Sequence, residues 1–121
     1  MKKWYFIVLV FLSGFSFCTY YSEQELYPDA SCDTTDLSYI FDIKPIFEKN
    51  CFSCHGSTGT YSDILNLENF DHIQRVVDNG RLLRNIKHDP DGTPMPASGG
   101  KLSDCNINKI EAWINRGIPQ N

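Results

Sequence analysis

The stretch CFSCHG, residues 51 to 56, places two cysteines three positions apart and a histidine directly after the second. The chain has only five cysteines and three histidines, so Cys51, Cys54 and His55 gather much of its thiol and imidazole chemistry in one place. Three kinds of site use a C-x-x-C pair: a zinc site, a redox-active dithiol and covalently attached haem. They differ in what else they require of the sequence.

A structural zinc ion takes about four ligands, usually from two such pairs, and the chain has no second C-x-x-C pair. A thioredoxin-like dithiol requires a strand before the first cysteine, and no strand pattern precedes Cys51. Haem c requires only the local motif C-x-x-C-H, in which both thiols bond to the porphyrin and the histidine ligates iron. The motif therefore predicts one covalent haem c on Cys51 and Cys54, with His55 as the proximal iron ligand.

A candidate for the sixth iron ligand lies in the later segment HDPDGTPMPASGGKLS. Met95, the only methionine after the initiator, stands there between Pro94 and Pro96, in a stretch that fits neither helix nor strand. A methionine held in such a loop is poorly placed to fill a core, and we expect it to be the distal ligand. The alternative is an exposed or gap-filling methionine. His72 and His88 are the rival ligands, although each is better explained as a polar residue near a helix end.

The first residues have the pattern of an export signal. Two lysines precede an apolar run from Trp4 to Leu12, which is shorter than the roughly 20 apolar residues that span a bilayer. Residues 1–17 are therefore excluded from the expected fold. The alternative is a short buried helix at the start of the domain.

Cys18 stands where a bacterial lipoprotein carries its lipidated cysteine. Phe15 and Phe17 depart from the usual leucine and small residue of that signal, but the following residues have no helical or strand period. We expect Cys18 to be lipidated and residues 18–31 to form a flexible tether to a membrane. The alternative is ordinary secretion, with Cys18 lost or left as a free thiol.

Without residues 1–17 the chain has 104 residues, which suffices for one small domain, expected at residues 32–121. Loss of Lys2 and Lys3 lowers the formal charge from −4 to −6, which disfavours nucleic acid as a partner. The chain also lacks a nucleophile elbow, a phosphate-binding loop and a second metal cluster. These observations favour a protein without enzymatic activity or a small-molecule substrate.

Hydrophobic spacing predicts an all-α domain. Before the cysteine motif, Ile40, Ile43 and Phe47 follow a helical period, and Pro45 is tolerated only in a first turn, so a helix is expected to begin with Asp42 as its N-cap.

Three further helices are expected after the motif, separated by Asn79-Gly80 and by the methionine loop. The last has Ser103 as its N-cap candidate and ends at Gly117. Their apolar positions are Ile73, Val76 and Val77; Leu82, Leu83 and Ile86; and Ile107, Ile110, Trp113 and Ile114.

The segments FDIKPIFEKNCFSCH, PMP and LSDCNINKIEAWINRGIP, in this order, resemble the class I cytochrome c domain, and in particular the small monohaem envelope cytochromes of the Bacteroidetes group. The resemblance covers residues 32–121. It implies that the first and last helices cross beside the haem, that His55 and Met95 are the axial ligands, and that the protein transfers single electrons. Many class I members have a proline after the motif whose carbonyl orients the histidine; here none follows, so the group that orients His55 is open.

These observations predict an electron carrier of the bacterial cell envelope or periplasm. If protein side chains fill both axial positions, iron has no open site for a substrate. The alternative is a haem-based ligand-binding or sensor protein in which a small gas displaces Met95. Of the five cysteines, Cys32 and Cys105 then remain, and in an oxidising compartment an even pair is expected to form a disulfide. The alternative for this pair is two separate buried thiols.

Overall fold

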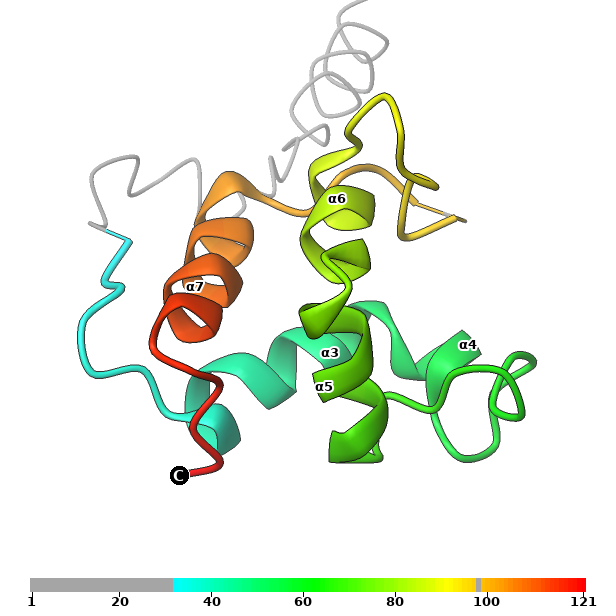
Figure 1. The fold of residues 1–121 in the computed structure, drawn as a ribbon, viewed down its shortest axis with the longest axis horizontal. Coiled ribbons are helices and arrows are strands. Elements are labelled where there is room, and N and C mark those ends of the chain that lie inside the picture. The colour runs from blue at the N-terminus through cyan, green and yellow to red at the C-terminus, as the bar shows by residue number, and fades with distance from the viewer. Residues whose placement is uncertain (1–31, 98) are drawn as a thin grey trace, which may run out of the picture. The chain divides into compact units, whose positions relative to one another are not determined.

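The computed structural model describes residues 32–97 and 99–121, and residues Cys32–Asn121 form one compact unit. The predicted signal segment, Cys18 and the predicted tether lie outside the described residues. Every regular element in the described part is a helix, which confirms the all-α class (Figure 1). The elements are a π-helical turn η1 (Tyr39–Ile43) and the α-helices α3 (Lys44–Asn50), α4 (Phe52–His55), α5 (Phe70–Asp78), α6 (Arg81–Lys87) and α7 (Asp104–Asn115).

The first helix begins earlier than its sequence predicted. Ser38, not Asp42, is the N-cap: its hydroxyl accepts a hydrogen bond from the Phe41 amide at 3.4 Å, and the Asp42 carboxylate accepts one from the Ser38 amide at 2.9 Å. Asp42 therefore supports the cap from inside the helix, in the reciprocal manner of a capping box. Pro45 lies in the first turn of α3, but the π-helical turn η1 runs directly into α3, so the helical run begins earlier than the position of Pro45 predicted.

The π-helical turn also changes which side chains face the core. A π-turn takes more residues than an α-turn, so it shifts the phase of the apolar stripe by part of a turn. Ile43 and Phe47 are buried as expected, but Ile40 is 52% exposed, and the prediction that it shares their face is wrong.

Helices α5 and α6 follow the predicted pattern and contact one another. Asn69 caps α5, and its side chain accepts a hydrogen bond from the Asp71 amide at 2.9 Å. Between the two helices Gly80 has a φ of 71°, a left-handed conformation that glycine adopts without strain. The two helices bury Ile73 and Val76 from α5, and Leu82 and Ile86 from α6.

Helix α7 has the predicted cap and stop. The Ser103 hydroxyl accepts a hydrogen bond from the Asn106 amide at 3.3 Å, and Gly117 beyond the helix has a φ of 84°. The helix buries Ile107, Ile110 and Trp113 and contacts both η1 and α6.

An aromatic cluster joins four elements around Trp113, whose side chain is fully buried. Its indole stacks on Tyr39 of η1 at a centroid distance of 5.5 Å and meets Phe47 of α3 and Phe70 of α5 edge-on at 6.4 and 6.2 Å. The indole N–H donates to the Pro119 carbonyl at 3.0 Å, so the one polar atom of the ring is satisfied. The cluster fixes the beginning of the described domain against its last helix.

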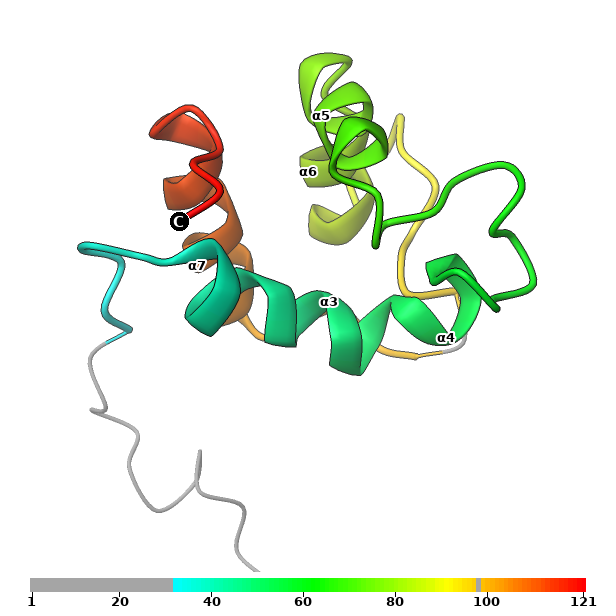
Figure 2. The same cartoon turned by 90° about the horizontal axis from the view of Figure 1, so that it is seen from below.

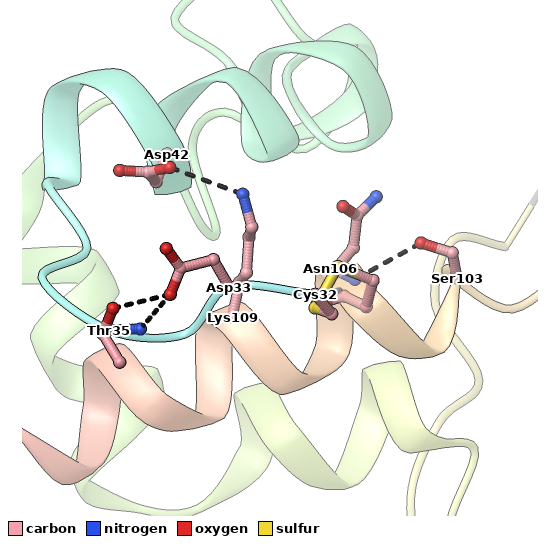
Figure 3. Close-up of a disulfide and its surroundings, with 8 residues drawn as sticks. Cys32, Asp33, Thr35, Asp42, Ser103, Asn106 and Lys109 are labelled. Atoms are coloured by element: carbon pink, nitrogen blue, oxygen red, sulfur yellow. Dashed lines mark hydrogen bonds and ion pairs between the residues drawn. A yellow bond between two sulfur atoms is a disulfide. The ribbon is translucent and has the colours of Figure 1, made fainter. Parts of the chain in front are cut away.

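A disulfide joins Cys32 and Cys105, the pair predicted from the cysteine count. The bridge ties the segment before η1 to the first turn of α7 (Figure 3). On the same face the Lys109 ammonium lies 3.4 Å from the Asp42 carboxylate, which links α7 to η1 a second time.

The last residues of the chain bind back to the same region. The Asn121 backbone oxygen accepts hydrogen bonds from the Ser38 hydroxyl at 2.9 Å and from the Ile40 amide at 3.2 Å. The Asn121 side-chain oxygen accepts a third from the Tyr39 amide at 3.1 Å. Together η1, α3 and α4 form one run that extends from α7 to the loops on the other side of the domain (Figure 2).

Candidate functional site

The cysteine motif lies where α3 ends and α4 begins. The Cys51 amide donates to the Phe47 carbonyl at 2.8 Å, which continues the hydrogen bonding of α3. The Cys51 carbonyl accepts from the amides of Cys54 at 3.1 Å and His55 at 2.8 Å, which closes the single turn of α4. The end of α3 and the single turn of α4 therefore position both thiols and the imidazole, and neither cysteine is in a disulfide.

The loop of residues 56–69 folds back onto this turn. The Tyr61 amide donates to the Cys54 carbonyl at 2.9 Å, and the Leu67 amide donates to the His55 carbonyl at 2.7 Å. Gly59 packs directly on the backbone of Cys54, because a Cβ atom at position 59 would collide with the Cys54 carbonyl. These contacts satisfy carbonyls that a four-residue helix leaves without an internal partner.

A backbone carbonyl of the same loop holds the histidine ring. His55 Nδ1 lies 3.3 Å from the Leu65 carbonyl oxygen. A carbonyl can only accept, so Nδ1 carries the proton and Nε2 keeps its lone pair. This is the arrangement in which an outer hydrogen bond fixes the tautomer of a metal-binding histidine. The Leu65 carbonyl is thus placed to orient the His55 ring, for which the sequence offered no proline.

A cavity of about 520 Å³ opens beside the motif. Both cysteines and His55 line it, together with the loop 61–67, the facing sides of α5 and α6, and Met95–Ala97. Its volume is within the roughly 300–1,000 Å³ typical of pockets that bury small organic ligands.

Met95 enters this cavity from the loop after α6. Its amide donates to the Asn85 carbonyl at 3.1 Å, and its carbonyl lies 3.0 Å from Nε2 of His88. The neighbouring Thr93 amide donates to the Asn85 side-chain oxygen at 3.0 Å. The loop is therefore fastened to the end of α6 on both sides of the thioether.

The two rival histidines have other partners. His72 Nδ1 accepts from the Asn66 amide at 3.0 Å, and His88 Nε2 bonds to the Met95 carbonyl. Neither histidine lines the cavity, whereas His55 does. This geometry favours His55 over His72 and His88 as an iron ligand.

Two arginines lie at the cavity without ionic partners in the described part of the chain. Arg75 of α5 and Arg81 of α6 both line it, and neither forms an ion pair with residues 32–97 or 99–121. Guanidinium groups suit carboxylates because they can donate two parallel hydrogen bonds. Sequence reasoning missed this pair; the signal available was an arginine on either side of the predicted Asn79-Gly80 turn.

Burial and, to a smaller extent, the neighbouring Cys54 raise the pKa of the Cys51 thiol to about 11. Cys51 is therefore a neutral thiol at physiological pH in the unmodified chain. A neutral sulfur in an apolar wall is compatible with a thioether, which carries no charge.

The apolar surface left open at the cavity tests whether haem fits. Tyr61 and Ile64 line the cavity and are 50% and 75% exposed, which is costly for large apolar side chains. A flat apolar macrocycle would cover Tyr61 and Ile64, and its carboxylates would lie close enough to bind Arg75 and Arg81. The donor set of two thiols, an imidazole and a thioether matches haem c. The residues present therefore fit this group.

The other two interpretations of the motif find less support. The described residues contain no group of three or more histidine, cysteine, aspartate or glutamate side chains that could hold a metal ion. They also contain no strand, which a thioredoxin-like dithiol needs. Within the same residues no helix is long and apolar enough to cross a membrane.

Comparison with known proteins adds one finding. Residues 42–114, more than half of the chain, match the family model described as cytochrome c oxidase, cbb3-type, subunit III. The match runs from η1 almost to the end of α7 and contains the motif, the cavity and Met95. No curated protein and no solved structure matches the chain.

Proposed function

Since this match makes the chain a member of the cytochrome c domain family, we propose that the protein is a monohaem electron carrier of the bacterial cell envelope. Family membership implies covalent haem c, and the two cysteines that would bind it are present. The observation that carries the proposal is the single cavity lined by Cys51, Cys54, His55 and Met95.

Each of these residues has a distinct role in the proposal. The thiols of Cys51 and Cys54 would bond to the porphyrin and hold it in the cavity. His55 would ligate iron through Nε2, because the Leu65 carbonyl accepts from Nδ1–H. Met95 would supply the sixth ligand from a loop that is hydrogen-bonded to the end of α6. Arg75 and Arg81 would bind the carboxylates of haem.

Bound haem c supplies a one-electron ferric/ferrous couple. The chain's own residues then decide what that couple is used for. If His55 and Met95 occupy both axial positions, neither oxygen nor a substrate can coordinate iron, and only electron exchange remains. A neutral thioether favours the ferrous state and raises the potential. This supports a carrier and not an enzyme.

The proposal places the domain outside the cytoplasm, bound to a membrane through lipidated Cys18. The family and the disulfide both support an oxidising compartment. Labelled palmitate is expected to enter the wild-type protein and not Cys18→Ser. Equal incorporation into both, or none into either, would contradict the anchor. The likeness to envelope monohaem cytochromes of the Bacteroidetes group motivates this part of the proposal.

Haem staining of a denaturing gel tests covalent attachment. The wild-type protein is expected to stain after boiling in detergent, and Cys51→Ala/Cys54→Ala is not. Colour that leaves the mature wild-type protein on acid-acetone extraction would contradict the attachment.

Met95→Ala tests the sixth ligand and separates a carrier from a sensor. The variant is expected to lose the sulfur-to-iron charge-transfer absorption, to have a lower midpoint potential, and to bind carbon monoxide and cyanide readily. An oxidised Met95→Ala protein with the absorption and potential of the wild type would show that the ligand lies elsewhere. Carbon monoxide that readily displaces the ligand of the wild-type protein would favour the sensor.

A further inference from the structure

The loop that carries Met95 has few ways to hold its own backbone. Pro94 and Pro96 have no N–H group, so Met95 has the only backbone donor between positions 94 and 96. That donor is bound by the Asn85 carbonyl at 3.1 Å. The position of the residue then depends on what holds its carbonyl.

That carbonyl is held by a side chain. His88 Nε2 lies 3.0 Å from the Met95 oxygen, and because a carbonyl only accepts, Nε2 carries a proton and donates. Among the described residues, His88 is the only one whose side chain hydrogen-bonds to Met95. The backbone of Met95 is thus bound at both polar atoms to the last turn of α6.

The backbone of His88 aims the ring at this carbonyl. His88 is the C-cap of α6 and has φ 60° and ψ 42°, a left-handed conformation that glycine favours and that asparagine, aspartate and histidine adopt more often than other residues with a β-carbon. Glycine or asparagine would end the helix there at lower cost. From this left-handed cap the His88 ring reaches the Met95 carbonyl, 3.0 Å from Nε2.

The surrounding loop is packed closely enough for such a contact to matter. A Cβ atom at Gly92 would lie 2.9 Å from the Arg84 carbonyl oxygen and 3.2 Å from the Asn85 side-chain oxygen. The Asp89 amide also donates to the Arg84 carbonyl at 3.0 Å. The chain therefore turns tightly over the end of α6 before it reaches Met95. The loop has little freedom to rearrange and form another hydrogen bond if the one from His88 is lost.

We propose that His88 is a positioning residue that holds Met95 in ligating position through its carbonyl. The inference rests on the proposed function, since it assumes that Met95 ligates iron. It differs from the simple alternative, in which His88 only ends α6. The two explanations predict opposite orders for how strongly different substitutions of His88 disturb the protein.

Three substitutions separate the rankings. His88→Gly and His88→Asn suit the left-handed cap but have no donor at the place of Nε2. His88→Gln suits the cap less well but carries its amide nitrogen the same number of bonds from Cα as Nε2. If His88 positions Met95, glutamine preserves ligation best. If His88 is only a cap, glycine and asparagine preserve the protein best and glutamine is the most disturbed.

The measurement is cyanide binding to the oxidised, haem-loaded full-length protein, together with the sulfur-to-iron absorption and thermal unfolding. His88→Gly and His88→Asn are expected to bind cyanide about tenfold faster than the wild type, the change expected from one lost hydrogen bond. Their unfolding temperatures should be equal or higher. His88→Gln is expected to retain the wild-type rate within about threefold. His72→Asn, which keeps an acceptor for the Asn66 amide, is the matched control and should match the wild type.

A wild-type cyanide rate and absorption in His88→Gly would overturn the positioning role, and so would a rate in His88→Gln as high as in His88→Gly. These outcomes are distinct from failure of the proposed function. If the wild-type protein lacks the sulfur-to-iron absorption, or if Met95→Ala retains it, the ligand assignment fails before any His88 variant is considered.

Discussion

The two sides of the described domain are completed in different ways. The first, here called the α7 side, consists of residues 32–43 and 104–121; the second, the cavity side, consists of residues 51–69, 88–97 and 99–101. On the α7 side the chain supplies its own core, a buried indole, a disulfide and hydrogen bonds that Asn121 accepts. On the cavity side the chain leaves an open cavity, which is lined in part by the exposed side chains of Tyr61 and Ile64, and one helix has only four residues. Ile40 and Phe41 are exposed on the α7 side, but they do not line this cavity.

The difference shows where the chain depends on an added group. A domain of this size buries little apolar surface by itself and usually needs a staple. Here the disulfide serves the α7 side, and haem would serve the cavity side. Helices α3, α5 and α6 contribute to both sides of the domain. The cavity therefore rests on helices that pack against the α7 side without haem.

Loss of haem attachment should produce the largest difference in stability between the two sides of the domain. In haem-free Cys51→Ala/Cys54→Ala protein, amides of residues 56–69 and 88–101 are expected to exchange with deuterium almost as fast as in an unfolded chain. Amides of α7 are expected to exchange on the order of 100-fold more slowly, because their contacts do not involve the cavity. Equal loss of protection in α7 would show that its side of the domain does not fold alone.

Trp113→Ala should damage the other side. Loss of a fully buried indole is expected to lower the free energy of unfolding by about 3–5 kcal/mol, measured by chemical denaturation. Phe41→Ala is the control, since Phe41 is 82% exposed, and it should change stability by no more than about 0.5 kcal/mol. A comparable loss in both variants would argue against the aromatic cluster as the centre of the fold.

The double variant Cys32→Ser/Cys105→Ser should lower the stability of the α7 side and leave the proposed iron ligands unchanged. The bridge joins positions 73 apart, and its loss is expected to cost about 4 kcal/mol by loop-closure entropy. The absorption spectrum of the folded protein should not change. A spectral change at unchanged stability would show that the bridge acts on the cavity side instead.

Gly59→Ala should have a smaller effect, confined to the cavity side. A β-carbon at this position meets the Cys54 backbone, so the variant is expected to lose about 1–3 kcal/mol and to mature with less attached haem. Gly100→Ala is the matched control, because no atom lies within 4 Å of a β-carbon placed there. Equal haem content in both variants would mean that the loop tolerates the displacement.

The sequence predicted the frame well because the frame follows local rules. Apolar residues at helical spacing, Ser103 before α7 and the Asn79-Gly80 turn all act within a few positions of the chain. The first helix was placed less well, since a π-helical turn has no periodic signature and shifted Ile40 to the surface. The Ser38 and Asp42 pair was the local signal that marked its true start.

The site was predictable to the extent that its chemistry lies in side chains. Cys51, Cys54, His55 and Met95 are residue types that bind haem and iron, and the structure gathers them. The partner of His55 was not predictable, because Leu65 contributes a backbone carbonyl that every residue has. The contact of His88 with Met95 depends on a left-handed backbone at the end of α6, which the sequence does not specify.

The Cys32–Cys105 bridge also has a mechanical consequence. If the chain before Cys32 is pulled against the far end of α7, the covalent load path enters at Cys32, crosses the two sulfurs and leaves through residues 105–121. Residues 33–104 form a closed loop beside that path and carry no tension through the backbone. The C-x-x-C-H motif and Met95 both lie inside this loop, so a pull on the chain before Cys32 would bypass the proposed ligands of the iron.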